Sequence, residues 1–108
     1  MIKQGEIYEF DLGGFKDHIT GKKRPVYVIS NNIANKFCPT IQICAVSTKK
    51  KNLPQQIEIH SLKKVSYVQC EQIHTIPKKL LGKKICECTK MEKARVCQGL
   101  MLQLGGIL

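Results

Sequence analysis

Aromatic residues are scarce in this chain, and tryptophan is absent. Phe, Tyr and Trp together make up 6% of the 108 residues, whereas the hydrophobic residues as a whole make up 43%. That hydrophobic content is sufficient for a core, so aliphatic side chains must supply most of it. A length of 108 residues suits one compact domain. Because we find no linker, repeat or low-complexity segment, we expect residues 1–108 to form a single domain.

Long apolar runs are also missing. No stretch of the sequence approaches the ~20 consecutive apolar residues that a membrane-spanning helix needs. Met1 leads into an amphipathic segment rather than into a signal peptide. We therefore expect a cytoplasmic protein with no membrane partner.

The six cysteines lack the spacing of a metal site. There is no C-x2-C pair, and Cys86 and Cys88 have no matching second pair. We therefore predict no metal ion and no cofactor. A disulfide framework is typical of exported chains, and no export signal supports one here. The cysteines in apolar, strand-like segments are instead predicted to be buried core thiols; these are Cys44, Cys70, Cys86 and Cys88.

Acidic residues are few: 8 Asp and Glu stand against 18 Lys and Arg, which gives a formal net charge of +10. A surplus of that size favours a polyanionic partner, which is RNA, DNA or an acidic protein. A lysine-rich surface that has no partner would give the same composition, because net charge reports on association and solubility rather than on fold.

Short apolar or alternating segments predict a chain built mainly of strands. The predicted strands are Ile7–Phe10, Pro25–Ser30, Thr40–Val46, Gln55–Ile59, Val65–Ile73 and Ile85–Cys88. Between the first two, Asp11–Lys23 holds three glycines and predicts a long loop. Asn31–Lys36 predicts a turn or a short helix, with Asn31 available as its cap.

The last element is predicted to be a helix. Thr89 and Glu92 have the spacing of a capping box, and Gly105 and Gly106 are expected to end the helix. Apolar residues at helical intervals are expected to face the core; they are Ala94, Cys97, Met101 and Leu104, with Leu100 beside them. Many short strands with one terminal helix predict a small, curled antiparallel sheet, closed or nearly so.

One arginine is placed to meet a phosphate. Arg24 precedes Pro25, and a proline pushes the residue before it into an extended conformation. Arg24 is therefore expected at the start of a strand, beside a basic loop. Its guanidinium offers a planar fork of donors that matches the oxygens of a phosphate.

Short motifs are spread along almost the whole chain. Their residues are Gly5 to Tyr8, Asp11, Leu12, Gly21, Arg24, Pro25, Val28 to Asn32, Asn35, Pro39, Thr40, Ser47, Thr48, Leu53, Pro54, Ile57, Ile59, Glu71 to Ile73, Thr75 and Ile76. These motifs resemble those of the MazF/PemK toxin family, whose members are ribosome-independent endoribonucleases. No single motif is decisive, but all of them occur in the family's order.

The resemblance implies a fold and a function. The implied fold is mainly β: a small SH3-like curled antiparallel barrel with a C-terminal helix, as in CcdB- and MazF-like toxins, assembled as a homodimer. The implied activity is sequence-specific, metal-independent cleavage of single-stranded RNA or mRNA. In such a reaction the RNA's own 2′-hydroxyl attacks the adjacent phosphorus and leaves a 2′,3′-cyclic phosphate and a 5′-hydroxyl. The implied protein partner is an acidic antitoxin, whose disordered tail folds into the RNA groove.

Four residues are the catalytic candidates that the resemblance implies. Arg24 matches the family's catalytic arginine, and Ser47 lies 23 residues further on, at the position of the family's catalytic threonine. Thr48 is the neighbouring alternative. In a strand these two hydroxyls would point to opposite faces, so only one of them is expected to serve. His18 lies in the loop where the family often carries Ser or His, and an imidazole suits proton transfer.

Basic and polar residues near these positions are candidates for RNA contact. They are Lys16, Thr20, Lys22, Lys23, Lys49, Lys50, Gln72 and His74. His74 replaces an arginine that is common in the family, and Ile19 and Thr20 replace its acidic and glutamine residues. The alternative to a direct role for each histidine is a structural one. The alternative for the lysines is that they form a solvated basic face that binds no RNA.

Two other functions remain open at this stage. The same barrel serves CcdB-like toxins, which bind DNA gyrase, although that reading does not account for an Arg-Pro pair combined with a hydroxyl. The altered loop segment Asp17–Thr20 keeps open a non-catalytic RNA-binding module.

Overall fold

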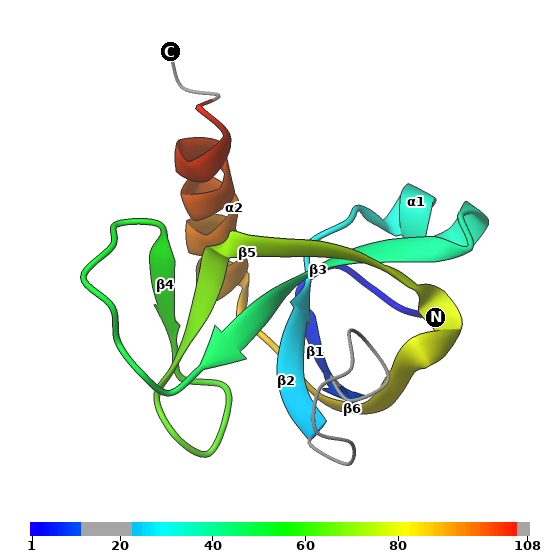
Figure 1. The fold of residues 1–108 in the computed structure, drawn as a ribbon, viewed down its shortest axis with the longest axis horizontal. Helices are drawn as coiled ribbons and strands as arrows, with labels where there is room; N and C mark the ends of the chain where they lie inside the picture. Colours follow the sequence, from blue (N-terminus) through cyan, green and yellow to red (C-terminus); the bar gives the residue numbers. More distant parts are fainter. Residues whose placement is uncertain (12–22, 106–108) are drawn as a thin grey trace.

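A computed structural model describes residues 1–11 and 23–105 (Figure 1). In chain order the elements are β1 (Glu6–Asp11), β2 (Lys23–Val28), α1 (Asn32–Phe37), β3 (Thr40–Ser47), β4 (Gln56–Ile59), β5 (Ser66–Pro77), the 3₁₀ helix η2 (Lys78–Leu80), β6 (Leu81–Glu87) and α2 (Lys90–Leu104). No helix among these residues is long and apolar enough to cross a membrane.

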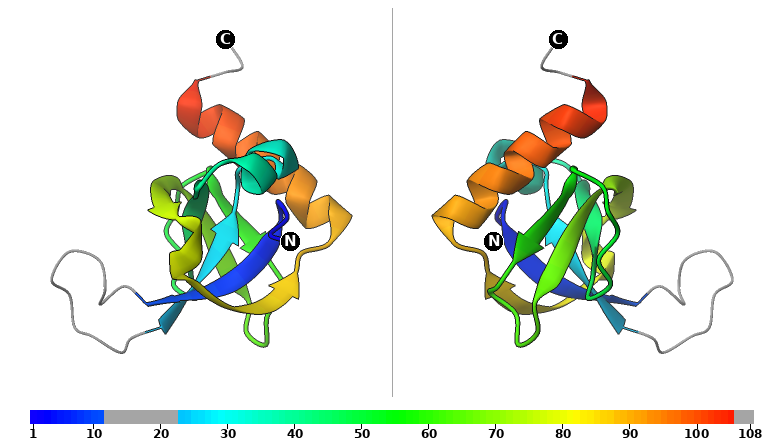
Figure 2. Two further views of the ribbon diagram at one scale, coloured as in Figure 1. Left: turned by 90° about the vertical axis from the view of Figure 1, so that its right-hand side faces the viewer. Right: turned by 90° about the vertical axis from the view of Figure 1, so that its left-hand side faces the viewer.

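The strands form one antiparallel sheet in the order β4-β5-β3-β2-β1-β6. The sheet curls strongly, and α2 packs against β4 and β5 (Figures 1 and 2). Within the described residues β4 and β6 are its two edges. The prediction of a mainly β protein with a curled antiparallel sheet and a terminal helix is confirmed.

Several element boundaries differ from the predicted ones because strand pairing extends or shortens them. Lys23 and Arg24 belong to β2 because they pair with Asp11 and Phe10 of β1. The same strand ends at Val28, two residues early. At the other end of the sheet, β5 continues to Pro77, which pairs with Thr40 of β3, and β6 begins as early as Leu81.

An irregularity in β5 changes which of its side chains face which side of the sheet. Cys44 pairs with Ile73 and Val46 with Val68, so a step of two residues along β3 corresponds to five along β5. Extra residues in one strand break the alternation of side chains and bend the strand. As a result Val68 packs in one core cluster, whereas Ile76 packs in the other.

The core has two parts, one on each face of the sheet, and aliphatic residues dominate both, as predicted. The first lies mainly under α2 and includes Tyr27, Val68 and Val96. The second lies within the curl and includes Val28 and Ile41.

Three of the four cysteines predicted to be core thiols are buried, and the fourth is half-buried. Cys44, Cys70 and Cys88 belong to the first core cluster, whereas Cys86 lies partly exposed in β6. Burial raises the pKa of Cys88 to about 12, so this thiol stays protonated and packs as a small apolar group.

The cap predictions are confirmed for Asn31, Thr89, Glu92 and Gly105, whereas Gly106 lies outside the described residues. Asn31 accepts a hydrogen bond from the Ala34 backbone N–H at 2.8 Å. Thr89 and Glu92 form the full capping box at the start of α2. Gly105 ends that helix with a φ of 70°, in the left-handed region that favours glycine.

The prediction for the buried face of α2 is wrong for four of its five residues. The helix buries Glu92, Val96 and Gly99, whereas Ala94, Cys97, Met101 and Leu104 are exposed. Leu100, the fifth, is half-buried and packs against the first core cluster. The reason is a close approach at Gly99, where an added Cβ would lie 2.9 Å from Cys70 Sγ. A bulkier face could not pack so near to β5.

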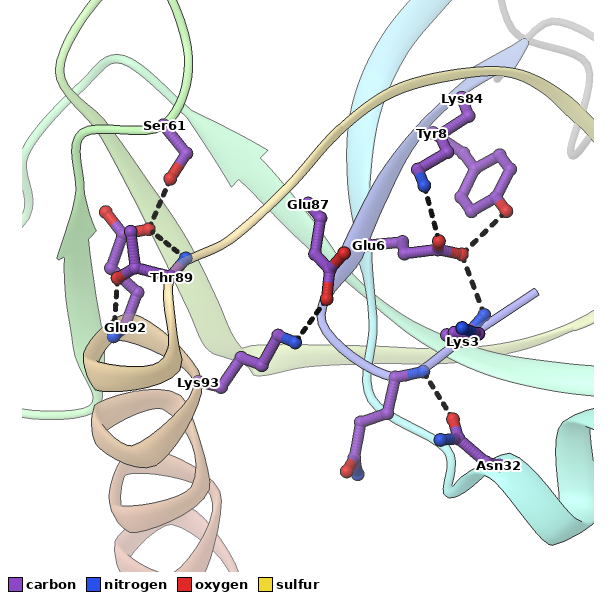
Figure 3. A network of polar contacts seen from close by, with 11 residues as sticks. Lys3, Glu6, Tyr8, Asn32, Ser61, Lys84, Glu87, Thr89, Glu92 and Lys93 are labelled. Atoms are coloured by element: carbon purple, nitrogen blue, oxygen red, sulfur yellow. Dashed lines mark hydrogen bonds and ion pairs between the residues drawn. The ribbon is translucent and has the colours of Figure 1, made fainter. Parts of the chain in front are cut away.

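Two buried carboxylates join distant parts of the chain (Figure 3). Glu6 in β1 is 3% exposed. Its carboxylate pairs with Lys84 Nζ of β6 at 2.7 Å and accepts from Lys3 N at 2.7 Å and from the Tyr8 hydroxyl at 2.8 Å. Burial alone would raise the pKa of Glu6, but these hydrogen bonds hold it below the ordinary value. The second carboxylate, Glu92, anchors the turn after β4 to the start of α2.

Candidate active site

A cavity of about 520 Å³ opens on the concave side of the sheet, and we call it the main cavity. Strands β2, β3 and β5 form most of its wall, and Phe10 of β1 contributes to the rest. Its polar lining residues are Arg24, Ser47, Thr48, Lys49, Ser66, Gln69, Gln72 and His74. Six of them are residues that the sequence had singled out, drawn from three separate segments.

Arg24 lies on the wall of the cavity that β2 forms, and the pairing of β2 with β1 sets its position. It stands opposite Phe10 of β1, and Pro25 stands opposite Glu9. Pairing of β2 with β3 begins two residues later, at Val26 and Ala45. Carrying that antiparallel register on by two residues places Arg24 opposite Ser47. The extended backbone predicted for the residue before a proline is therefore confirmed.

Ser47 and Thr48 lie at the end of β3. Ser47 is the last residue of the strand and half-buried, and its Oγ accepts a hydrogen bond from the Lys49 backbone N–H at 3.1 Å. Thr48 is exposed and follows the strand. Both residues line the main cavity, contrary to the expectation that they point to opposite faces. Strand alternation does not separate them, because Thr48 lies outside the strand.

The β5 wall carries the remaining predicted residues. Gln72 and His74 lie two positions apart and line the cavity together, Gln72 within the irregular stretch of β5 and His74 just after it. Glu71, within that irregular stretch, instead accepts a hydrogen bond from the Gln56 side chain of β4 at 2.7 Å. This contact joins Glu71 to β4, across the sheet from the cavity-lining residues of β3.

Sequence reasoning missed two lining residues. Ser66 is 3% exposed and Gln69 is 8% exposed, and both line the cavity from β5. The signal was available, because each is an uncharged polar residue within a strand that otherwise reads as buried. Buried polar groups of this kind are normally hydrogen-bonded, and Ser66 Oγ donates to the Lys64 carbonyl at 2.9 Å.

The electrostatic character of the main cavity is cationic. Arg24 and Lys49 line it, together with the imidazole of His74. Among the described lining residues there is no carboxylate. In the described part of the chain no cluster of three or more His, Cys, Asp or Glu has the arrangement of a metal site. The cavity is therefore suited to an anion.

Four candidates lie outside the described residues: His18, Lys16, Thr20 and Lys22. Two further lysines are described but do not line the main cavity. Lys50 is exposed on the segment after β3, whereas Lys23 lines a neighbouring cavity.

That neighbouring cavity, of about 460 Å³, we call the side cavity. It adjoins the main cavity through a shared wall of Arg24, Pro25, Thr48 and Ser66. Its other lining residues include Glu9, Lys23, Ser61, Leu62, Lys63, Lys64, Ile85 and Cys86. Arg24 therefore stands between two hollows on the same side of the molecule.

A family model described as "PemK-like, MazF-like toxin of type II toxin-antitoxin system" matches residues 3–104. The chain belongs to this family. The match includes every strand and both α-helices, so the whole fold is that of the family rather than a fragment of it.

Known proteins agree with this assignment. The chain is 32% identical over 111 aligned residues to a protein of Staphylococcus epidermidis named endoribonuclease MazF, and the alignment covers 97% of this chain and 92% of the relative. It also resembles a mycobacterial endoribonuclease solved in complex with its cognate antitoxin, with a TM-score of 0.84 and 23% identity over 97% of this chain and 96% of the other. A MazE–MazF structure from Deinococcus radiodurans gives a TM-score of 0.78 and 19% identity, with 96% and 95% of the two chains covered.

Proposed function

We propose that this family member is an endoribonuclease toxin that cleaves single-stranded RNA in the cytoplasm and is neutralised by an acidic antitoxin. The observation that carries the proposal is the convergence of Arg24, Ser47 and His74 on one cationic cavity from three different strands. The named relative is an endoribonuclease, and solved neighbours are complexes with an antitoxin. A gyrase inhibitor that acts by binding a protein would not need an arginine, a hydroxyl and an imidazole gathered in one cavity, so this arrangement favours the endoribonuclease.

The proposed reaction uses a nucleophile that RNA itself carries. The 2′-oxygen forms a bond to the adjacent phosphorus, and the bond from phosphorus to the 5′-oxygen breaks. The proton of the 2′-hydroxyl goes to a base, and the leaving 5′-oxygen takes up a proton. The products are a 2′,3′-cyclic phosphate and a 5′-hydroxyl, and no water is consumed in this step.

Arg24 and Ser47 have the properties needed to stabilise the charge that develops on the phosphate. Arginine stays protonated in proteins, so Arg24 is better suited to hold a negative phosphorane than to act as a base. Ser47 Oγ accepts a hydrogen bond from Lys49 N, which leaves its own O–H directed elsewhere, and we assign that O–H to a phosphate oxygen. Thr48 offers a second hydroxyl at the edge of the same cavity.

An imidazole can both accept and donate a proton, and we assign the proton transfer to His74, the one histidine among the described lining residues of the main cavity. Gln72, two residues away on the same wall, is placed to contact a base edge or the sugar. Cleavage by this set of residues needs no metal ion, because charge stabilisation and proton transfer are both supplied by side chains.

The protein partners follow from surfaces outside the cavity. The exposed apolar stripe of α2, with Ala94, Cys97 and Met101, supports the homodimer that the family resemblance implies. The net charge of +10 supports an acidic antitoxin. Both remain proposals for this chain.

The test is incubation of the purified protein with a long RNA of mixed sequence in excess EDTA, followed by mapping of the cut ends. We expect cleavage at a limited set of sequences, with 5′-hydroxyl ends that accept phosphate from a polynucleotide kinase without prior dephosphorylation. RNA that is bound but stays intact would instead indicate a non-catalytic binding module. Cleavage that EDTA abolishes would overturn the metal-independent mechanism.

A further inference from the structure

We propose that the side cavity is a second phosphate-binding subsite, which holds the RNA backbone next to the bond that is cut. This inference rests on the proposed endoribonuclease function and deepens it. The residues that distinguish the subsite are Lys63 and Lys64, in the turn between β4 and β5, together with Lys23 at the start of β2.

The position of the cavity is the first argument. Arg24, Pro25 and Thr48 line both hollows, so the side cavity begins where the main cavity ends. A strand whose reacting phosphate lies at Arg24 has a continuous path into the side cavity. Backbone phosphates follow one another along a strand, so the next phosphate needs a cation on that path.

The charge of the cavity is the second argument. Four cations line it, namely Lys23, Arg24, Lys63 and Lys64, against the single carboxylate of Glu9. Both Lys63 and Lys64 are exposed. Within residues 1–11 and 23–105, the side chains of Arg24, Lys63 and Lys64 take part in no hydrogen bond or ion pair. Their charges are therefore available to an anion.

The anchoring of the turn that carries these lysines is the third argument, and Figure 3 shows one of its anchors, the contact of Ser61 with Glu92. Glu92 of α2 is 4% exposed and accepts a hydrogen bond from His60 N at 2.6 Å and another from the Ser61 hydroxyl. Ser66 Oγ donates to the Lys64 carbonyl at 2.9 Å and closes the other end. A turn tied at both ends loses less conformational entropy when it binds a ligand.

The chemistry of the subsite indicates what it reads. Lysine ammonium groups act as point charges and suit phosphate rather than a particular base. Contacts of this kind position a strand without selecting its sequence. We therefore expect the side cavity to affect how tightly RNA binds, and not where it is cut.

The experiment compares the K63Q/K64Q variant with the matched control K36Q/K79Q. The control removes the same charge from exposed lysines that line neither cavity. For K63Q/K64Q we expect KM to rise roughly 15-fold at about 0.15 M salt, and the salt dependence of binding to flatten by about 1.4, as for two phosphate contacts on a single strand. We expect kcat and the cut sites to stay as in the wild type, and the control to change KM by less than about twofold.

A second arm identifies the phosphate itself. In RNA that carries one neutral methylphosphonate beside the mapped cut site, on either side in turn, one position should weaken wild-type binding. The same replacement should have little further effect in K63Q/K64Q, because the two changes remove one interaction.

The outcomes separate this inference from the proposed function. If the wild type cleaves RNA but K63Q/K64Q has an unchanged KM, or the control loses as much, the subsite is wrong and the endoribonuclease stands. If K63Q/K64Q loses binding to a poly-glutamate peptide while RNA binding holds, the cavity serves an acidic protein segment and the RNA subsite is wrong. If the wild type leaves RNA intact, the proposed function fails and the subsite fails with it.

Discussion

The segment Gly5 to Tyr8 and the pair Arg24–Pro25 both contribute to the family resemblance, but their surroundings are opposite in kind. Glu6 is buried, and Lys84, Lys3 and Tyr8 together satisfy its carboxylate. Arg24 is exposed, and among the described residues its guanidinium has no partner. One motif holds β1 against β6, whereas the other borders two cavities.

The comparison shows that two motifs which match a family equally well can differ in function: one stabilises the fold and the other is available to a ligand. A polar group whose hydrogen bonds are all met inside the protein contributes to stability and has little left to offer a ligand. A charge that faces a cavity contributes little to stability and is available for binding. Gly5, in the same segment as Glu6, also has a structural role, because its φ is 90° and an added Cβ would lie 2.5 Å from the Lys93 side chain.

The largest expected effect comes from Arg24. We expect Arg24→Ala to lower kcat/KM for RNA by at least ~10²-fold, as for loss of a positioned charge stabiliser, and to change the free energy of unfolding by less than about 0.5 kcal/mol. Arg24→Lys should not restore full activity, because the planar fork is lost. Initial cleavage rates and thermal unfolding measure the two effects. Near-normal cleavage by the alanine variant would contradict the assignment.

The opposite pattern is expected at Glu6. Glu6→Gln should lower the free energy of unfolding by about 2 kcal/mol at pH 7, because it leaves Lys84 without its buried partner. The matched control is Glu87→Gln, which breaks the more exposed pair with Lys93 and should lower the free energy of unfolding clearly less than Glu6→Gln does. The folded fraction of Glu6→Gln should cleave RNA at the wild-type rate.

The pH dependence of this stability difference has a defined sign. The pKa of Glu6 is lower in the folded protein than its ordinary value of 4.5. Its stabilising effect is therefore complete above pH 4.5 and is lost as the pH falls through the folded pKa. The difference in the free energy of unfolding between wild type and Glu6→Gln should become smaller below pH 4.5, as measured by denaturant unfolding across the acid range. A difference that stays constant into strong acid would show that the carboxylate charge is not responsible.

A smaller effect separates the two hydroxyls of the main cavity. We expect Ser47→Ala to lower kcat roughly tenfold, and Thr48→Ala to lower it less than about threefold, as for one hydrogen bond to a charged group against an edge contact. The reason is that the β2–β3 register places Ser47, not Thr48, opposite Arg24. Single-turnover cleavage rates decide between them. Should Thr48→Ala prove the more damaging change, the register of the site is off by one.

The smallest effect compares two neighbouring lysines. Lys49 lines the main cavity and Lys50 does not. We expect Lys49→Gln to weaken RNA binding about fourfold near 0.15 M salt, as for one phosphate contact, and Lys50→Gln to weaken it less than about twofold. Neither change should move the cut sites. Equal effects of the two substitutions would mean that their charges act at long range and not within the cavity.

Features that depend on neighbours in the chain could be predicted from the sequence. The Asn31 cap and the box of Thr89 and Glu92 connect residues three apart, so a local pattern is enough to find them. The buried face of α2 could not be predicted in the same way. Its apolar residues form an exposed stripe, and the buried face instead carries Glu92 and Gly99. Gly99 is buried there because it lies against Cys70 of β5, and Glu92 because it accepts a hydrogen bond from the turn after β4.

The sequence by itself determined the order and approximate positions of the strands and of the terminal helix, that aliphatic side chains form the core, and that an extended arginine and a strand-end hydroxyl are candidates for phosphate chemistry. Tertiary structure alone decided which polar residues share a cavity. The β2–β3 register brings Arg24 to Ser47, and the pairing of β3 with β5 sets His74 opposite Ile43, on a wall of the same cavity. The turn that carries Lys63 lines the side cavity together with Arg24, and Glu92 of α2 anchors that turn. These contacts join residues far apart in the chain, and no local pattern records which distant strand a given residue will face.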